Sequence, residues 1–148
     1  MIAIKRLATE LSELLFPVLC SACSKHLYSG EETICMYCLR DLPYTDHHLH
    51  ASNQVAKQLW ARLPFNAAMA MLYFKKGTKV QRLMHQLKYN GKTEVGVKMG
   101  QLLGEKLSQS PFYQSIDLVM PVPLHPRKQQ QRGYNQSEYI AKGIADVW

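Results

Sequence analysis

This 148-residue sequence has few acidic residues, only four cysteines and no long apolar run. Without the roughly 18 consecutive apolar residues that a membrane-spanning helix needs, no membrane span is expected. No small-residue cleavage site precedes Cys20, and Glu10 and Glu13 interrupt the segment after the N-terminal basic pair, which argues against a secretory signal. No repeat or low-complexity tract is present, and 47% of the residues are hydrophobic, too many for a disordered chain. We therefore expect a folded, cytoplasmic protein.

The shortage of acidic residues is concentrated in the middle of the chain. Lys and Arg number 18 against 11 Asp and Glu, for a net charge of +7. Residues 1–50 carry four basic residues against six acidic ones, whereas residues 51–110 carry ten against two. A basic stretch of this kind suits the phosphates of a polynucleotide or of a small phosphorylated ligand. A solvated helix surface is an equally good interpretation.

All four cysteines form two CxxC pairs, Cys20–Cys23 and Cys35–Cys38, separated by eleven residues. Disulfides are disfavoured in the cytosol. Two tight turns that aim four thiolates at one ion complete a tetrahedral site, which suits structural zinc and has no open position for catalysis. A redox pair is less favoured because it needs a single CxxC at a helix start within an α/β domain. Iron remains open from the sequence, as does a docking surface on the cysteine module.

The cysteine segment and its flanks predict a separate N-terminal module. Apolar residues at helical spacing between positions 4 and 15 predict an amphipathic helix that ends at Pro17. The polar run 44–53 is typical of a solvated linker and holds three histidines: His47, His48 and His50. We therefore predict a helix and zinc-ribbon module over residues 1–50 and a second domain over residues 51–148.

The second domain alternates short apolar runs with helical patterns. Residues 67–74 (AAMAMLYF) and 116–122 (IDLVMPV) are predicted strands. Helical spacing covers residues 78–89, and residues 136–147 form a helix capped by Asn135. The helix between them repeats glycine every fourth residue, which predicts close packing, at Gly96, Gly100 and Gly104. This order of strands and helices is typical of an α/β sheet.

The segment 117–135 (DLVMPVPLHPRKQQQRGYN) has the residue types of a phosphate-binding loop. It follows a predicted strand, and open α/β folds bind ligands at the carboxyl ends of their strands. Arg127 and Arg132 offer planar, bidentate donors, and Gly133 allows close backbone approach. The positive end of the helix that begins after Asn135 faces the same loop. These features favour a pyrophosphate ligand over the alternative, a polar hairpin with incidental arginines.

These motifs together resemble the ComF family of competence-associated, phosphoribosyltransferase-like proteins. The resemblance rests on the four-cysteine ribbon, LKYNGK at residues 87–92, the glycine-repeat helix, and DLVMPVPLHPRKQQQRGYNQSEYIA at residues 117–141. It implies a small four-cysteine zinc ribbon followed by a type I phosphoribosyltransferase-like, doubly wound α/β domain. It also implies a role in DNA uptake during natural competence, beside a helicase-like partner.

By position, the resemblance implies a site residue by residue. The zinc ligands would be Cys20, Cys23, Cys35 and Cys38. The ligand would be phosphoribosyl pyrophosphate with magnesium, and its pyrophosphate would lie on Pro123, Leu124 and His125. A mobile loop would cover it, formed by Arg127, Arg132, Gly133, Tyr134, Asn135 and Gln136. Lys88, with Tyr89, would reach the phosphates from the other side.

The sequence also departs from that family. Type I phosphoribosyltransferases carry a later strand that ends in two adjacent acids and a Thr/Gly-rich turn, which hold the ribose and its 5′-phosphate, and nothing here matches it. We therefore expect an incomplete, C-terminally truncated domain. One hypothesis is an enzyme that displaces pyrophosphate by a nitrogen nucleophile. The other is a non-catalytic module that holds single-stranded DNA or a partner protein on the zinc ribbon and the basic helix between Lys75 and Lys92.

Overall fold

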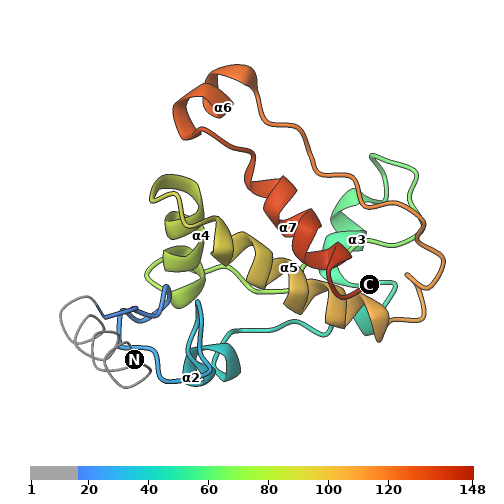
Figure 1. Cartoon of the computed structure of the whole chain (residues 1–148). Coiled ribbons are helices and arrows are strands. Elements are labelled where there is room, and N and C mark those ends of the chain that lie inside the picture. Colours follow the sequence, from blue (N-terminus) through green and yellow to red (C-terminus); the bar gives the residue numbers. More distant parts are fainter. Residues whose placement is uncertain (1–16) are drawn as a thin grey trace.

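The computed structural model describes residues 17–148, so the helix predicted before Pro17 lies outside the described residues. The described chain is mostly helical (Figure 1). Its helices are α2 (Met36–Arg40), the short 3-10 helix η1 (His47–Leu49), α3 (Gln54–Leu59), α4 (Lys79–Tyr89), α5 (Thr93–Ser108), α6 (Pro126–Arg132) and α7 (Gln136–Ala145). None of these helices is both long and apolar enough to cross a membrane.

The predicted α/β sheet is not confirmed. Among residues 17–148, β structure is limited to two isolated antiparallel bridges, Leu19 with His26 and Tyr44 with Leu72. The predicted strand 67–74 therefore pairs at a single point. The predicted strand 116–122 forms no ladder with another described strand, and its side chains Leu118, Met120 and Val122 lie exposed.

The helices α5 and α7 make the most extensive contact of the described chain (Figure 1). Glycines from both helices lie in it, as the glycine repeat predicted. A Cβ added to Gly100 would lie 2.9 Å from the Cα of Gly143, and one added to Gly143 would lie 2.9 Å from the backbone nitrogen of Gln101. Real Cβ atoms essentially never come that close to backbone. The two helices therefore pack backbone to backbone, and the absence of side chains makes the contact possible.

The helix α4 packs against α5 through its apolar side. Leu83 and Leu87 of α4 and Val95 of α5 are fully buried. The same hydrophobic core cluster includes Cys20 and Cys38, so the cysteine segment and the helices share one core. The boundary near residue 50 stays a prediction, but apolar contacts cross it.

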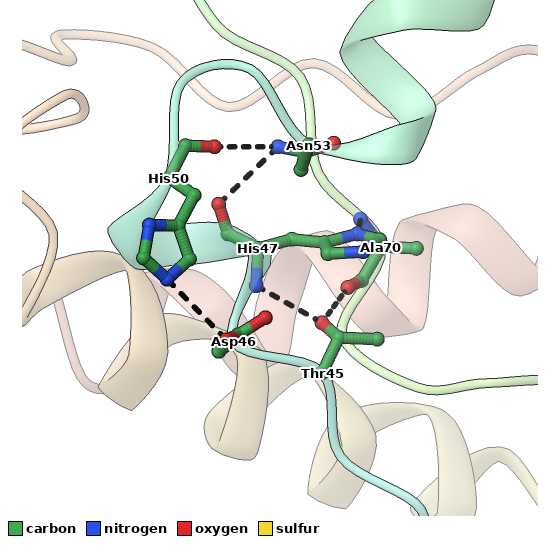
Figure 2. A network of polar contacts seen from close by, with 6 residues as sticks. All are labelled: Thr45, Asp46, His47, His50, Asn53 and Ala70. Atoms are coloured by element: carbon green, nitrogen blue, oxygen red, sulfur yellow. Dashed lines mark hydrogen bonds and ion pairs between the residues drawn. The ribbon is translucent and has the colours of Figure 1, made fainter.

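The predicted linker 44–53 is wrong in one respect, because His47 and His48 are buried rather than solvated. His50 is exposed and pairs with Asp46, its Nε2 lying 3.3 Å from the carboxylate. Figure 2 shows the side chain of Asn53 between the two histidine carbonyls, donating to His50 at 2.8 Å and to His47 at 3.3 Å. Polar side chains in this segment form hydrogen bonds with buried backbone groups, whereas the polar composition alone predicted that they face solvent.

The segment around His47 also joins distant parts of the chain. The hydroxyl of Thr45 donates to the carbonyl of Ala70 and accepts from the His47 backbone N–H at 3.4 Å (Figure 2). The hydroxyl of Ser110, which is fully buried just after α5, donates to the carbonyl of His48. Residues 44–53 therefore form a fixed hub rather than a spacer.

Adding a methyl group to the helix contact should destabilise the fold. Gly100→Ala forces Cβ into the backbone of α7, and we expect the free energy of unfolding to fall by about 2 kcal/mol or more. The substitution would otherwise be expected to stabilise a helix, since alanine is the better helix former. Urea unfolding followed by circular dichroism measures the change, with Ser108→Ala at the exposed end of α5 as the control. Equal stability of Gly100→Ala and the wild type would contradict the close contact.

The buried His48 predicts a pH dependence of stability. Burial lowers the pKa of His48 below its ordinary value of 6.5, and the nearby Lys106 adds to the effect. The folded state therefore holds this imidazole neutral. The stabilisation is complete above pH 6.5 and is lost as the pH falls through the lower folded-state pKa.

We expect unfolding free energy to decrease on acidification from pH 7 to pH 5, and His48→Gln to reduce that slope. The matched control is His50→Gln, which changes an exposed histidine two residues away and should leave most of the slope. If both variants titrate like the wild type, His48 is not the group responsible.

Candidate functional site

The four cysteines lie together as the CxxC spacing predicts. Their sulfur atoms all lie within 4.8 Å of one another. The Sγ atoms of Cys23 and Cys35 are 3.9 Å apart, close to the roughly 3.8 Å that separates two sulfurs in a tetrahedral zinc site with Zn–S bonds of about 2.3 Å. Cys20, Cys35 and Cys38 are buried and Cys23 is partly so. The cluster fits a zinc ribbon and could hold a metal such as zinc.

Backbone groups around the cluster favour a thiolate at Cys20. The N–H of Cys35 donates to the sulfur of Cys20 at 3.3 Å. Burial raises the pKa of Cys20, but N–H donors from Cys35, Ala22 and Cys23 outweigh it and lower that pKa to about 7. At Cys38 burial and the neighbouring thiols raise the pKa instead. A bound dication would reverse that second effect, because coordinating thiols lose their protons to the metal.

The loop between the CxxC pairs is held by its own side chains. Glu31 accepts from the backbone N–H of Tyr28 at 2.9 Å and from that of Met36 at 2.6 Å. The second contact fixes the start of α2, the helix that carries Cys38. An ion pair of 2.6 Å joins Asp41, just after α2, to Lys79 at the start of α4. These contacts attach the cysteine module to the helical part of the chain.

A second group of candidate site residues surrounds a cavity of about 210 Å³ at the C-terminal end of α4. The lining residues come from the end of α4, the turn after it, the last turn of α6 and the connection from α6 to α7: Lys88, Tyr89, Gly91, Gln131, Arg132 and Tyr134. Two of them are cationic and none is acidic. We call this cavity the basic pocket.

Arg132 and Tyr89 face each other across the basic pocket. The guanidinium carbon of Arg132 lies 5.5 Å from the centroid of the Tyr89 ring, within the range of a cation–π contact. One of its nitrogens donates to Gln136 at 2.8 Å. Because a guanidinium has five N–H donors in a planar fork, these contacts leave donors for an anion.

Tyr134 joins the loop before α7 to α4. Its hydroxyl donates to the carbonyl of Leu87, and its ring meets the edge of Tyr139 at a centroid distance of 5.6 Å. Burial raises the pKa of Tyr134, which keeps the hydroxyl protonated as a donor. Asn135 then starts α7, accepting from Ser137 at 3.1 Å and donating to the carbonyl of Val122 at 3.0 Å. The cap predicted at Asn135 is confirmed.

The structure brings together only part of the predicted ligand site. Lys88, Arg132 and Tyr134 line the basic pocket, while Asn135 and Gln136 support it from α7. Gly133 takes a left-handed conformation, with φ of 79°, and ends α6. The other predicted residues are not among the residues that line this cavity: Pro123, Leu124, His125 and Arg127.

The segment predicted as a loop contains a helix, α6. His125 caps it by accepting from the backbone N–H of Arg127 at 3.3 Å. Pro126 occupies the first turn and Gly133 follows the last residue, the usual order of these residue types at helix ends. Pro126 before and Gly133 after the run of helix-forming residues RKQQQR were the sequence features that could have predicted α6. Gln131 and Gly91 were also missed as lining residues, although both adjoin predicted ones.

Comparison with curated proteins finds similarity to DNA utilization proteins. The chain is 28% identical over 131 residues to the DNA utilization protein YhgH of Escherichia coli K12, which covers 86% of this chain and 53% of that protein. The YhgH protein of Shigella flexneri matches equally. That of Salmonella typhimurium is 32% identical over 66 residues, or 43% of this chain and 29% of the relative.

The chain spans about half the length of the first of these curated relatives. No protein-family model matches the chain, and no solved structure matches it.

The four cysteines should bind one metal ion per chain. We expect Cys20→Ser to abolish stoichiometric metal binding and to lower the free energy of unfolding by at least about 3 kcal/mol, since metal binding and folding are coupled in such sites. Elemental analysis of the purified protein and thermal unfolding with and without a chelator measure both effects. His26→Ala is the control, because His26 follows Cys23 by three residues and is exposed. Full metal content in Cys20→Ser would refute the four-thiolate site.

Proposed function

We propose that this chain is a ComF-like, cytoplasmic DNA utilization protein that binds phosphoribosyl pyrophosphate in the basic pocket. The observation that carries this proposal is that Lys88 and Tyr89 line one cavity with Arg132, which lies more than 40 residues later in the chain, and that no acid lines it. The similarity to YhgH proteins supports the link to DNA utilization. The cysteine cluster, which we propose holds zinc, supports the relation to ComF proteins.

The chemistry of the basic pocket suits a diphosphate. Arg132 can take two phosphate oxygens in its planar fork, and Lys88 supplies a point charge from the opposite helix. Tyr89, which is 64% exposed, offers an aromatic face beside the cations. Magnesium, when bound with such a ligand, would neutralise part of the diphosphate charge. We assign ligand binding to these residues because their charges and the Tyr89 ring line one cavity.

A second candidate function is binding of single-stranded DNA. It is supported by the long interval between Asp46 and Glu94, which contains eight Lys and Arg residues and no acid. Lys79, one of the eight, pairs with Asp41 and contacts the ring of Tyr37 at 4.7 Å, so its role is partly structural. A helicase-like partner, as the ComF resemblance implies, would meet this protein on the same DNA.

Removal of either cation should weaken ligand binding. We expect Arg132→Ala and Lys88→Ala to reduce the affinity for magnesium phosphoribosyl pyrophosphate by about tenfold each, the usual cost of losing one charged hydrogen-bond donor. Isothermal titration of the 148-residue chain measures this, with inorganic pyrophosphate as a second ligand.

Lys128→Ala is the charge-matched control for that titration. Lys128 is exposed on α6 and does not line the basic pocket. An equal loss in Lys128→Ala would indicate general electrostatic attraction instead of a site. No binding by the wild-type chain would overturn the phosphoribosyl proposal.

A further inference from the structure

A third surface, at the end of α3, has aromatic and basic residues that neither described site uses. A cavity of about 270 Å³ lies there, lined by Ala51, Ser52, Ala56, Lys57, Trp60, Phe65 and Asn66. We call it the α3 groove. Figure 1 shows α3 near one end of α5 and α4 near the other, so the α3 groove and the basic pocket lie apart. Trp60 is 81% exposed, the highest value among the large hydrophobic residues of the described chain.

The backbone holds Trp60 in this exposed position. Asn53 caps α3 by accepting from the N–H groups of Val55 and Ala56, each at 3.0 Å, and it also donates to the carbonyl of Ala68 at 2.7 Å. The N–H of Trp60 donates to the carbonyl of Ala56 at 2.9 Å. The ring is therefore carried by an anchored helix rather than by a loose end.

The charges around the α3 groove indicate what would cover Trp60. Lys57 lines the groove with Trp60, and Arg62, two residues after Trp60, is exposed. No acidic residue lies between positions 47 and 93. A partner must therefore be anionic and must also offer flat apolar surface to the indole. Single-stranded nucleic acid combines the two, since its phosphates meet cations while its bases stack on aromatic rings whatever the sequence. A peptide of acidic residues alone supplies the charge but has no aromatic planes to stack on the indole.

We propose that the α3 groove binds single-stranded DNA, with a base stacked on Trp60 and the flanking phosphates on Lys57 and Arg62. Phe65 forms the second aromatic wall of the groove. The inference rests on the second proposed function and deepens it by naming the residues that take the base. It is independent of ligand binding in the basic pocket.

The experiment uses the full chain with an oligothymidylate of about 15 nucleotides. The sequence contains two tryptophans, Trp60 and Trp148, so in Trp148→Phe all tryptophan fluorescence comes from Trp60. We expect the oligonucleotide to quench that fluorescence. We expect Trp60→Ala to lower the affinity measured by fluorescence anisotropy about tenfold, and Trp60→Phe to lower it less, because a smaller ring still stacks. Trp148→Phe is the matched control and should bind like the wild type.

Each outcome of the titrations separates the proposals. Wild-type affinity in Trp60→Ala, with circular dichroism showing a folded chain, would overturn the α3 groove but leave single-stranded DNA binding in place. No binding by the wild type would overturn both. Quenching of Trp60 by poly-glutamate and not by the oligonucleotide would identify an acidic-peptide site and also refute the proposal. Substitution of both Lys57 and Arg62 by alanine should reduce the slope of log affinity against log salt concentration by about two, because two phosphate contacts are lost.

Discussion

The glycine-lined contact between α5 and α7 is the constraint on which the proposed pocket depends. Gly100 and Gly143 bring the two backbones to a distance that no other residue allows. That distance sets where α7 begins, and hence where Tyr134 and Arg132 stand relative to α4. A Cβ added to Gly96 would also meet Leu87, the residue whose carbonyl accepts from Tyr134. Helix packing and the geometry of the basic pocket are therefore parts of one arrangement.

The cysteine cluster and the helices are linked in a similar way. Cys20 and Cys38 belong to the same apolar cluster as Leu83 and Leu87, and Lys79 ties the start of α4 to the residue after α2. Metal binding that orders the cysteine segment would thus also stabilise α4, which ends at the basic pocket. A structural ion at one end of α4 can support a ligand site at the other without touching the ligand.

Local patterns in the sequence were enough to predict α4, α5, α7 and the cysteine cluster, whereas α2, α3 and α6 were not predicted. Spacing of apolar residues and the cap at Asn135 predicted α4 and α7 closely, because the signals act within a few residues of each other. CxxC pairs predicted the cluster for the same reason. The buried hub around His47 could not be predicted, since its partners, such as Ala70 and Ser110, lie far along the chain. Strand pairing could not be predicted for the same reason. An apolar run such as 116–122 has the composition of a strand, but it does not identify the neighbouring strand with which it would pair.

Net charge alone would not have located a site on this molecule. Lys79 and Lys106 both lie against aromatic rings, at 4.7 Å from Tyr37 and 5.7 Å from Tyr44, and so help to hold the fold together. Lys57 and Lys88 form no ion pair with another described residue, and each stands beside an aromatic ring that lines a cavity. A cation beside an exposed ring and an open cavity is a stronger indication of ligand binding than a cation already occupied by its own chain. By that criterion the positive middle of this sequence separates into structural lysines and two surfaces suited to anions.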